Sequence, residues 1–491
     1  LWFKMLLHHE LIPDPARILF TEQHMSHAAS AFLCSPFDEA AVLTEDGVGE
    51  WATASNGTGR GNQIKIDQEI RFPHSLGLLY SVFTAFLGFE VNEGEYKVMG
   101  MAPYGQPRYV DRVEKLIRVD RDGSFHLDMD YFSYHYSTTE AFTAKFVDLF
   151  GPPRQPESYF FTMSSGYPSY FGAKPGNFAE LAKRNEYYAD VAASIQAVTE
   201  EILLKMANAL HRNTGQRRLC MAGGVALNSV ANGRLLKESP FEELYIQPAA
   251  GDSGAAVGAA LYAYHMVLGQ PRRFVMDHAY WGQEFSAGAI HDALAAENIR
   301  AEGFCDEDKL LDRVADWLSE GKVAGWYQGK FEWGPRALGH RSILADPRRA
   351  EMKDVVNTKI KFREPYRPFA PSVLEERAAE LFDLPEPERH YPSRFMLYVV
   401  DVKDGAKEKL PAITHVDGSA RLQTVRQDTS PRYYRLIEKF AQASGVPVLL
   451  NTSFNLRGEP IVNSPGDALK TFYNSGLDFL VLGDKIIAKE P

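Results

Sequence analysis

The amino-acid sequence predicts an α/β protein with two domains. A strand over 218–222 is followed by a glycine turn and a helix, and a strand over 244–248 repeats that order. Such alternation is typical of phosphate-binding α/β domains. A chain of 491 residues is also too long for one hydrophobic core. We expect a first domain over 1–272 and a second over 273–491, divided at a Gly- and Pro-containing break.

Residue patterns predict the elements of these domains in chain order. Ala40–Thr44 has the composition of a short buried strand and ends in an acidic, glycine-containing turn. The stretch 106–185 is irregular and rich in Tyr, Phe, Ser and Pro, so we interpret it as an insertion or lid. Apolar residues recur at helical spacing from Val191 to Leu210 and predict a long amphipathic helix. The α/β pattern of the second domain begins around Leu310.

Composition excludes several classes of function. The net charge of −11 argues against a broad nucleic-acid-binding surface, although a local basic pocket fits that total. The three cysteines are far apart and form no CxxC pair, so we expect neither disulfides nor a cysteine zinc site, and a cytoplasmic location. No stretch approaches the roughly 18 consecutive apolar residues of a membrane-spanning helix. We therefore expect neither nucleic acid nor a membrane as partner.

Basic and amide side chains gather in the last third of the chain, among glycines, prolines and aromatic residues. Arginine offers a rigid fork of donors that suits phosphate or carboxylate. A single arginine would ordinarily be a solvated surface residue, but several in such surroundings favour a built anion site. The asparagines and the serine add groups that can read an amide-like head. The candidate residues are Arg336, Arg341, Lys361, Arg367, Arg421, Asn451, Ser453 and Asn455.

A second candidate site begins at Gln23. On a helix, Gln23 and His27 share one face, and His24 lies three residues before His27. Imidazole nitrogens suit Fe, Zn or Mn. Asp46 and Asp252 each follow a predicted strand, at the edge where α/β sheets bind ligands, and could complete a metal site. The alternative is that either histidine has an ordinary structural role.

Three glycine-containing loops are weaker candidates for a nucleotide site. Lys97 is central to a glycine-punctuated loop and could reach a phosphate, although the loop taken alone favours an ordinary turn with a solvated lysine. Gly223–Gly224 and Gly251–Gly254 each follow a predicted strand and precede a helix. Neither is a P-loop or a GxGxxG fingerprint, but the pair favours a nucleotide.

These motifs together resemble the O-carbamoyltransferases of the NodU and antibiotic-tailoring type. The resemblance runs from about 14 to 488 and includes Asp46–Gly47, Ser75–Gly77 and Lys97–Gly100. Its other carriers are His24–Ser30, Ala222–Asn228, Gly334–Gly339, Arg367–Ser372 and Asn451–Asn455. The resemblance implies an actin/hexokinase-like (ASKHA) first domain and a YrdC-like α/β second domain.

The resemblance also implies a two-step reaction. ATP and carbamoyl phosphate would give carbamoyl adenylate in the second domain, and the first domain would transfer the carbamoyl group to the hydroxyl of a small molecule. Arg336, Lys361, Arg367 and Arg421 would be the catalytic residues of the first step. The transfer domain's nucleotide would contact Gly77, Lys97, Gly223, Gly224 and Asn228. His27, Asp46 and Asp252 fall on the family's iron ligands, so we expect Fe(II), with Mg²⁺ accompanying ATP.

The chain departs from the family pattern in two places. Gln23 stands where the family usually has a histidine, which leaves Gln23, His24 or a vacancy as the first metal ligand. The chain starts at Leu1, and we expect the family's N-terminal segment to be missing. The acceptor and a homodimeric state are left open. A nucleotide-binding, sugar-kinase-like or regulatory protein without transfer activity is the alternative function.

Overall fold

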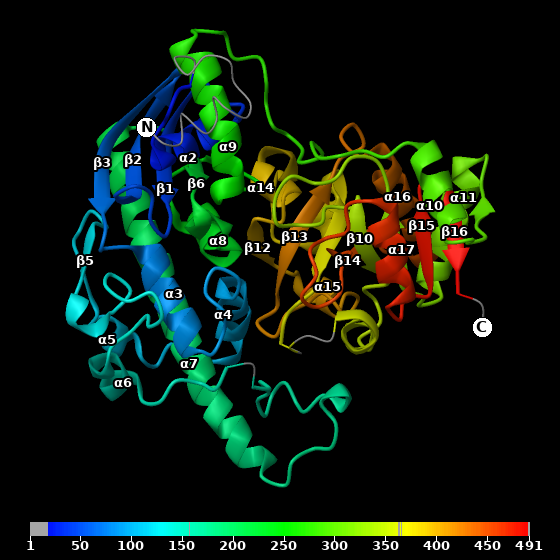
Figure 1. The fold of residues 1–491 in the computed structure, drawn as a ribbon, viewed down its shortest axis with the longest axis horizontal. Coiled ribbons are helices and arrows are strands. Elements are labelled where there is room, and N and C mark those ends of the chain that lie inside the picture. The colour runs from blue at the N-terminus through cyan, green and yellow to red at the C-terminus, as the bar shows by residue number, and fades with distance from the viewer. Residues whose placement is uncertain (1–17, 157, 362–363, 365, 490–491) are drawn as a thin grey trace.

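The chain forms a mixed α/β structure built on two large sheets. This computed structural model describes residues 18–156, 158–361, 364 and 366–489. A five-stranded sheet lies in the first half of the chain and a nine-stranded sheet in the second half, with the two halves side by side (Figure 1). The expected α/β class is confirmed. The two sheets fall on either side of the predicted boundary at 272, which remains a prediction.

The first sheet has the strand order β3-β2-β1-β6-β7. Strand β1 is parallel to β6, and β6 is parallel to β7, whereas β2 is antiparallel to both of its neighbours, β1 and β3. The carboxyl ends of the parallel strands therefore meet at one edge. The strands span Glu39–Glu45 (β1), Ala52–Arg60 (β2), Gln63–Arg71 (β3), Arg218–Ala222 (β6) and Glu243–Ile246 (β7). The strands predicted near 40, 218 and 244 are confirmed.

Helices position the residues that surround this edge. The predicted amphipathic helix is α7, which spans Phe178–Thr214 and ends where Gly215 adopts a left-handed conformation. The other helices are α2 (Gln23–Phe32), α3 (Leu76–Phe86), α4 (Glu95–Met101), α8 (Ser229–Glu238) and α9 (Asp252–Leu261). A short π-helix, Tyr262–Val267, continues α9.

Helices α2 and α9 pack in close contact because Gly258 has no side chain. A Cβ atom at Gly258 would lie 1.8 Å from the backbone oxygen of Ser26. The substitution Gly258→Ala is therefore expected to push α2 away from α9 and lower the free energy of unfolding by about 1–3 kcal/mol. Urea denaturation measures this change. Gly405→Ala is the matched control, since a Cβ there meets no atom within 4 Å; equal stability of the two variants would contradict the expectation.

The stretch 106–177 has little regular structure, as its composition predicts, but residues 178–185 of the predicted insertion belong to α7. It contains α5 (Val110–Val113), a hairpin of β4 (Ile117–Val119) and β5 (Phe125–Leu127), and α6 (Ala144–Phe150). Phe146 and Phe150 of α6 are fully buried, stack on one another and make edge-to-face contacts with Phe83 and Phe86 of α3. The α6 part of this stretch is thus fixed to the core.

The second sheet has the strand order β12-β13-β11-β14-β10-β9-β15-β16-β8. Its strands span Glu302–Gly303 (β8), Ala324–Tyr327 (β9), Arg341–Ala345 (β10), Ala370–Leu374 (β11), Tyr398–Asp401 (β12), Ser419–Val425 (β13), Val448–Ser453 (β14), Phe479–Leu482 (β15) and Lys485–Ala488 (β16). Its longer helices are α10 (Ala287–Ala296), α11 (Glu307–Ser319), α16 (Pro431–Ser444) and α17 (Pro465–Tyr473). Helix α11 confirms the α/β pattern predicted around Leu310.

Short segments complete this half, namely α12 (Met352–Val356), a π-helical turn (Asn357–Lys361), α13 (Ala378–Leu381), α14 (Tyr391–Arg394) and α15 (Asp404–Lys407). Over the described ranges, none of the helices combines the length and apolar character needed to cross a membrane.

Helix α8 joins the two halves along the edge strand β12. A Cβ atom at Gly233 would lie 2.1 Å from the backbone oxygen of Val399. The side-chain amide of Asn232 donates to the backbone oxygen of Leu397 at 3.1 Å, and Lys237 Nζ lies 2.5 Å from Asp401 Oδ2. The second sheet is therefore held directly against the helix that follows β6.

Candidate functional site

Sheet topology explains why distant basic segments meet in the second half. Strands β13, β11, β14 and β10 are neighbours in the sheet. Ala370 at the start of β11 pairs with Asn451 near the end of β14, and Ser453 pairs with Ser342 near the start of β10. Ser372 pairs with Gln423, so Arg421 lies near the start of β11 as well. The segments that precede β10 and β11 therefore converge with the end of β14.

These segments line a cavity of about 390 Å³. Six of the predicted anion-site residues belong to its wall, namely Arg336, Arg367, Arg421, Asn451, Ser453 and Asn455. The first half of the chain contributes to the same wall through Tyr96, Met99, Gly100 and Pro103 of the α4 region and Ser229–Val230 of α8. The cavity thus lies between the two halves and combines three guanidinium groups with apolar surface.

Arg336 is the arginine whose surroundings point most directly to an anion. Its Nε is buried, and among the described residues no acceptor lies within hydrogen-bonding reach of that nitrogen. Burial and the positive charge of Arg367 lower the pKa of Arg336 to about 10, while the nearby Tyr96 opposes this shift. Arg336 is still charged at neutral pH. A buried charged donor without an acceptor favours an anionic ligand.

The loop that carries Arg336 is fixed by a buried carboxylate. Glu332 is 3% exposed, and its Oε1 accepts hydrogen bonds from the backbone N–H groups of Leu338 (2.7 Å), His340 (2.9 Å) and Arg341 (3.2 Å). On the other side, Asn451 Nδ2 donates to the backbone oxygen of Ala337 at 3.3 Å. The position of Arg336 is therefore set by both anchors.

Lys361 supports the cavity wall. Its Nζ donates to the backbone oxygen of Ser453 at 2.5 Å and to Asn455 Oδ1 at 2.7 Å, and Ser453 Oγ donates to the same Oδ1 at 2.8 Å. Lys361 does not belong to the lining of the cavity. The structure thus brings this lysine to the predicted site, with contacts that orient Ser453 and Asn455.

Arg341 is the predicted anion-site residue that the structure places elsewhere. Its side chain is fully buried, lies 3.6 Å from the ring centroid of Tyr327 and donates to the backbone oxygens of Gln328 (2.6 Å) and Gly329 (3.1 Å). Successive side chains of a strand point to opposite faces, and Arg341 begins β10. It stabilises the neighbouring loop and does not line the cavity.

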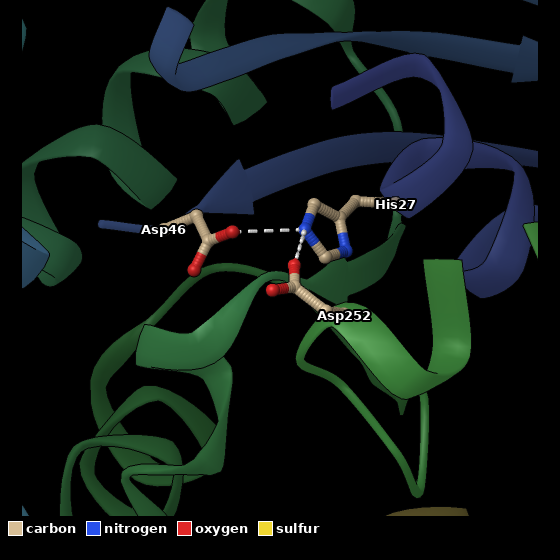
Figure 2. A group of neighbouring side chains, drawn as sticks. All are labelled: His27, Asp46 and Asp252. Carbon is tan, nitrogen blue, oxygen red and sulfur yellow. Dashed lines mark hydrogen bonds and ion pairs between the residues drawn. The ribbon is translucent and has the colours of Figure 1, made fainter. Parts of the chain in front are cut away.

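A second cluster lies at the carboxyl edge of the first sheet. His27 comes from α2, Asp46 follows β1, and Asp252 begins α9, and Figure 2 shows the three side chains pointing toward one another. His27 Nε2 lies 3.0 Å from Asp46 Oδ2 and 3.8 Å from Asp252 Oδ1. Burial alone would raise the pKa of Asp46, but the hydrogen bond and charge of His27 hold it below its usual value.

Gln23 completes this cluster, and His24 lies outside it. Gln23 Nε2 donates to Asp252 Oδ1 at 2.7 Å and to Asp46 Oδ2 at 3.0 Å. His24 Nδ1 instead lies 2.7 Å from Thr44 Oγ1, and burial with the charge of His27 lowers the pKa of His24 to about 4. Over the described ranges, the ligand atoms that gather within 4.8 Å of one another belong to His27, Asp46 and Asp252.

The predicted nucleotide residues separate into two places. Gly77, Gly223 and Gly224 surround the end of β1. A Cβ atom at Gly77 would lie 2.6 Å from the backbone oxygen of Asp46, and Gly223 has a φ of +96°. The Gly224 N–H donates to Asp46 Oδ1 at 3.1 Å. Asn228 caps α8 by accepting from the Ala231 N–H at 3.1 Å. Lys97 lies apart from them, in α4 beside the anion cavity, with Nζ 3.5 Å from Glu364 Oε1.

Two family models together match most of the chain. The model described as the carbamoyltransferase N-terminus matches residues 9–261, and the model described as the carbamoyltransferase C-terminus matches residues 315–489. The chain belongs to the carbamoyltransferase family. The resemblance stated from the sequence motifs is thereby confirmed, and the protein is a carbamoyltransferase enzyme.

Three relatives show the range of this carbamoyltransferase's similarity. An uncharacterised protein of Synechocystis is 48% identical over 97% of this chain and 77% of its own length. The nodulation protein NolNO of Sinorhizobium fredii is 40% identical over 97% of this chain and 65% of its own length. The 3'-hydroxymethylcephem-O-carbamoyltransferase of Amycolatopsis lactamdurans is 36% identical over 54% of this chain and 48% of its own length.

Several residues of the carbamoyltransferase's cavity were not predicted from the sequence. Tyr96 belongs to its wall, and so do His415 and Asp417. The backbone N–H and the hydroxyl of Ser419 donate to Asp417 Oδ1, which holds this carboxylate in place. His415 Nε2 lies 3.1 Å from the backbone oxygen of Tyr366. An Asp-Gly-Ser turn indicates a loop but gives no sign of a ligand. Only the fold brings that turn, together with the nearby Arg421, beside Arg336 and Arg367.

Proposed function

We propose that this carbamoyltransferase is an ATP-dependent O-carbamoyltransferase that works in two steps. Carbamoyl phosphate and water first give carbamate and inorganic phosphate. A carbamate oxygen then attacks the α-phosphorus of ATP, so that carbamoyl adenylate forms and pyrophosphate leaves. In the second step an acceptor hydroxyl attacks the carbamoyl carbon, the bond to the AMP oxygen breaks, and the hydroxyl proton is removed.

The convergence of Arg336, Arg367 and Arg421 on one cavity carries this proposal. Each phosphate-bearing reactant is polyanionic, and fixed guanidinium groups stabilise charge as phosphoryl bonds rearrange. Ser453 and Asn455 lie in the same wall and offer the neutral groups that an amide-like carbamoyl head requires. Apolar residues of α4 and α8 provide surface for an adenine ring.

The cluster at the end of β1 fits a divalent cation. It offers one imidazole nitrogen and two carboxylates, and across the residues that the structure describes, neither carboxylate has a lysine or arginine partner. His27, Asp46 and Asp252 would hold the ion, and rotation of the Gln23 amide would present its oxygen as a further ligand. Fe(II) suits this donor set. When bound, the cation would polarise the phosphate of the adenylate.

Because adenylate formation and carbamoyl transfer are proposed at different sites, we also propose a finer fold assignment for each half of the chain. The five-stranded sheet, with its ligand residues at the carboxyl edge, would be the actin/hexokinase-like transfer domain. The nine-stranded sheet would be the YrdC-like domain that makes the adenylate, accompanied by Mg²⁺. The acceptor would be the hydroxyl of a small molecule, and carbamoyl phosphate would be the co-substrate.

Exchange of labelled pyrophosphate into ATP tests the first step. Exchange is expected only when carbamoyl phosphate is present, because the reverse reaction requires carbamoyl adenylate. Omission of carbamoyl phosphate, and its replacement by inorganic phosphate, are the two controls. Exchange of equal rate in all three mixtures would indicate a nucleotide-binding or regulatory protein instead, and would overturn the proposal.

A further inference from the structure

Helix α4 belongs to the first half of the chain, yet it contacts the residues that precede β11 in the second half. In Figure 1, α4 lies on the side of the first half that faces the second sheet. Tyr96, Met99 and Gly100 of α4 belong to the wall of the anion cavity. The cavity is therefore incomplete without a helix that is remote from it in sequence.

Contacts from α4 lead directly to Arg367. The guanidinium carbon of Arg367 lies 4.6 Å from the ring centroid of Tyr96, within the range of a cation–π interaction. Arg367 Nη1 lies 3.4 Å from Glu364 Oε2, and the other oxygen of that carboxylate lies 3.5 Å from Lys97 Nζ. Arg367 is thus held by an aromatic face on one side and by a carboxylate that Lys97 fixes on the other.

Burial makes these contacts stronger than those of surface ion pairs. The side chains of Lys97 and Glu364 are each 15% exposed, and that of Arg367 is 21% exposed. Although burial alone raises the pKa of Glu364, the charges of Arg367 and Lys97 lower it below its usual value. Glu364 is therefore a carboxylate that joins two cations in a partly dehydrated setting, where charge interactions are only weakly screened.

Tyr366 fixes the same segment to the first half from a third direction. Its side chain is fully buried, and its ring centroid lies 4.9 Å from that of Phe160 and 6.1 Å from that of Tyr104. Both partners belong to the first half of the chain. The backbone around Arg367 is thus anchored at Glu364 and Tyr366 by residues that the second sheet does not supply.

We infer that α4 positions Arg367 in the anion site. Tyr96 contacts the guanidinium group of Arg367 directly, and Lys97 acts on Arg367 through Glu364. Lys97 then acts in the site of the second half and not as a nucleotide ligand of the transfer site. This inference rests on the proposed function of the cavity. It makes carbamoyl phosphate activation depend on a helix of the first half.

Steady-state pyrophosphate exchange with the full chain tests the role of Tyr96. Tyr96→Leu removes the aromatic face and is expected to raise the KM for carbamoyl phosphate about 5- to 30-fold, with a smaller change in kcat. Tyr96→Phe keeps the ring and is expected to restore most of this loss. If Tyr96 had a purely structural role, Tyr96→Leu would lower kcat and thermal stability without a selective increase in the KM for carbamoyl phosphate. Equal KM values for wild type and Tyr96→Leu would overturn the role of Tyr96.

A double-mutant cycle tests the path through Glu364. Lys97→Met and Glu364→Gln are each expected to raise the same KM about 10-fold, and the double variant is expected to be no worse than Glu364→Gln alone. Lys145→Met is the matched control. Like Lys97, Lys145 pairs with a carboxylate, that of Asp130, and its Nζ lies 4.2 Å from the ring centroid of Tyr131. These residues lie outside the cavity. Additive losses would contradict a path through Glu364.

The outcomes separate failure of this inference from failure of the proposed function. If wild type shows exchange that depends on carbamoyl phosphate while Lys97→Met exchanges normally, the inference fails and the proposed function stands. Normal exchange with loss of overall product formation in Lys97→Met would assign Lys97 to the transfer site instead. If wild type shows no such exchange, the proposed function itself fails.

Discussion

Replacing Arg336 by alanine is expected to lower carbamoyl-phosphate-dependent pyrophosphate exchange about 10²- to 10³-fold, the loss typical when one donor to a developing charge is removed. Arg336 is a cavity arginine whose buried Nε has no acceptor among the described residues, so this donor is available to the reactants. Its pKa of about 10 keeps the guanidinium charged throughout the neutral range. The measurement is the exchange rate at saturating ATP across carbamoyl phosphate concentrations.

Two further variants separate the charge of Arg336 from its shape. Arg336→Lys retains the charge and loses the bidentate fork, so its exchange rate should lie between those of wild type and Arg336→Ala. Arg118→Ala removes an arginine whose side chain is 73% exposed and should leave exchange unchanged. Exchange within threefold of wild type in Arg336→Ala would rule out this residue as a principal anion ligand.

Replacing Asp46 by asparagine is expected to abolish binding of the proposed cation and block transfer while pyrophosphate exchange continues. Asp46 Oδ2 lies 3.0 Å from His27 Nε2, and its Oδ1 accepts from the Gly224 N–H at 3.1 Å, so this carboxylate lies at the centre of the cluster. Asparagine keeps the shape of the side chain and loses the negative charge that a divalent cation requires. Elemental analysis of the purified protein measures the metal content directly.

The expected result is about one equivalent of iron in wild type and less than about a tenth of that in Asp46→Asn. Asp148→Asn, at an exposed position of α6, is the control that should keep the metal. Retention of full metal content in Asp46→Asn would contradict the assignment of this cluster. Loss of exchange in the same variant would show that the two clusters do not act in separate steps.

Most of the regular structure near the first sheet follows from local patterns. Alternation of strands, glycine turns and helices predicted β1, β6, β7, α7 and α9 because each element depends mainly on nearby residues. The parallel arrangement then explains why Asp46 and Asp252, which follow different strands, lie together. Asp46, Asp252 and His27 were therefore accessible to reasoning from the sequence.

The individual partners of charged side chains were not predictable in this way. Arg341 and Arg336 belong to the same short motif, yet one is bound by backbone oxygens and the other lines the cavity. His24 and His27 are three residues apart, but only His27 joins the two aspartates. In each case the direction of a side chain within its element decided the outcome.

By itself, the sequence determined the family, the α/β class and the residue types of two candidate sites, because short motifs and local periodicity carry that information. The tertiary structure alone decided that α4 reaches across to Glu364 and Arg367, so that both halves of the chain form the anion cavity. Lys97 and Glu364 are separated by more than half of the chain. No local pattern encodes such a pairing, because it arises only when the packing of α4 against the segment that precedes β11 brings the two charges together.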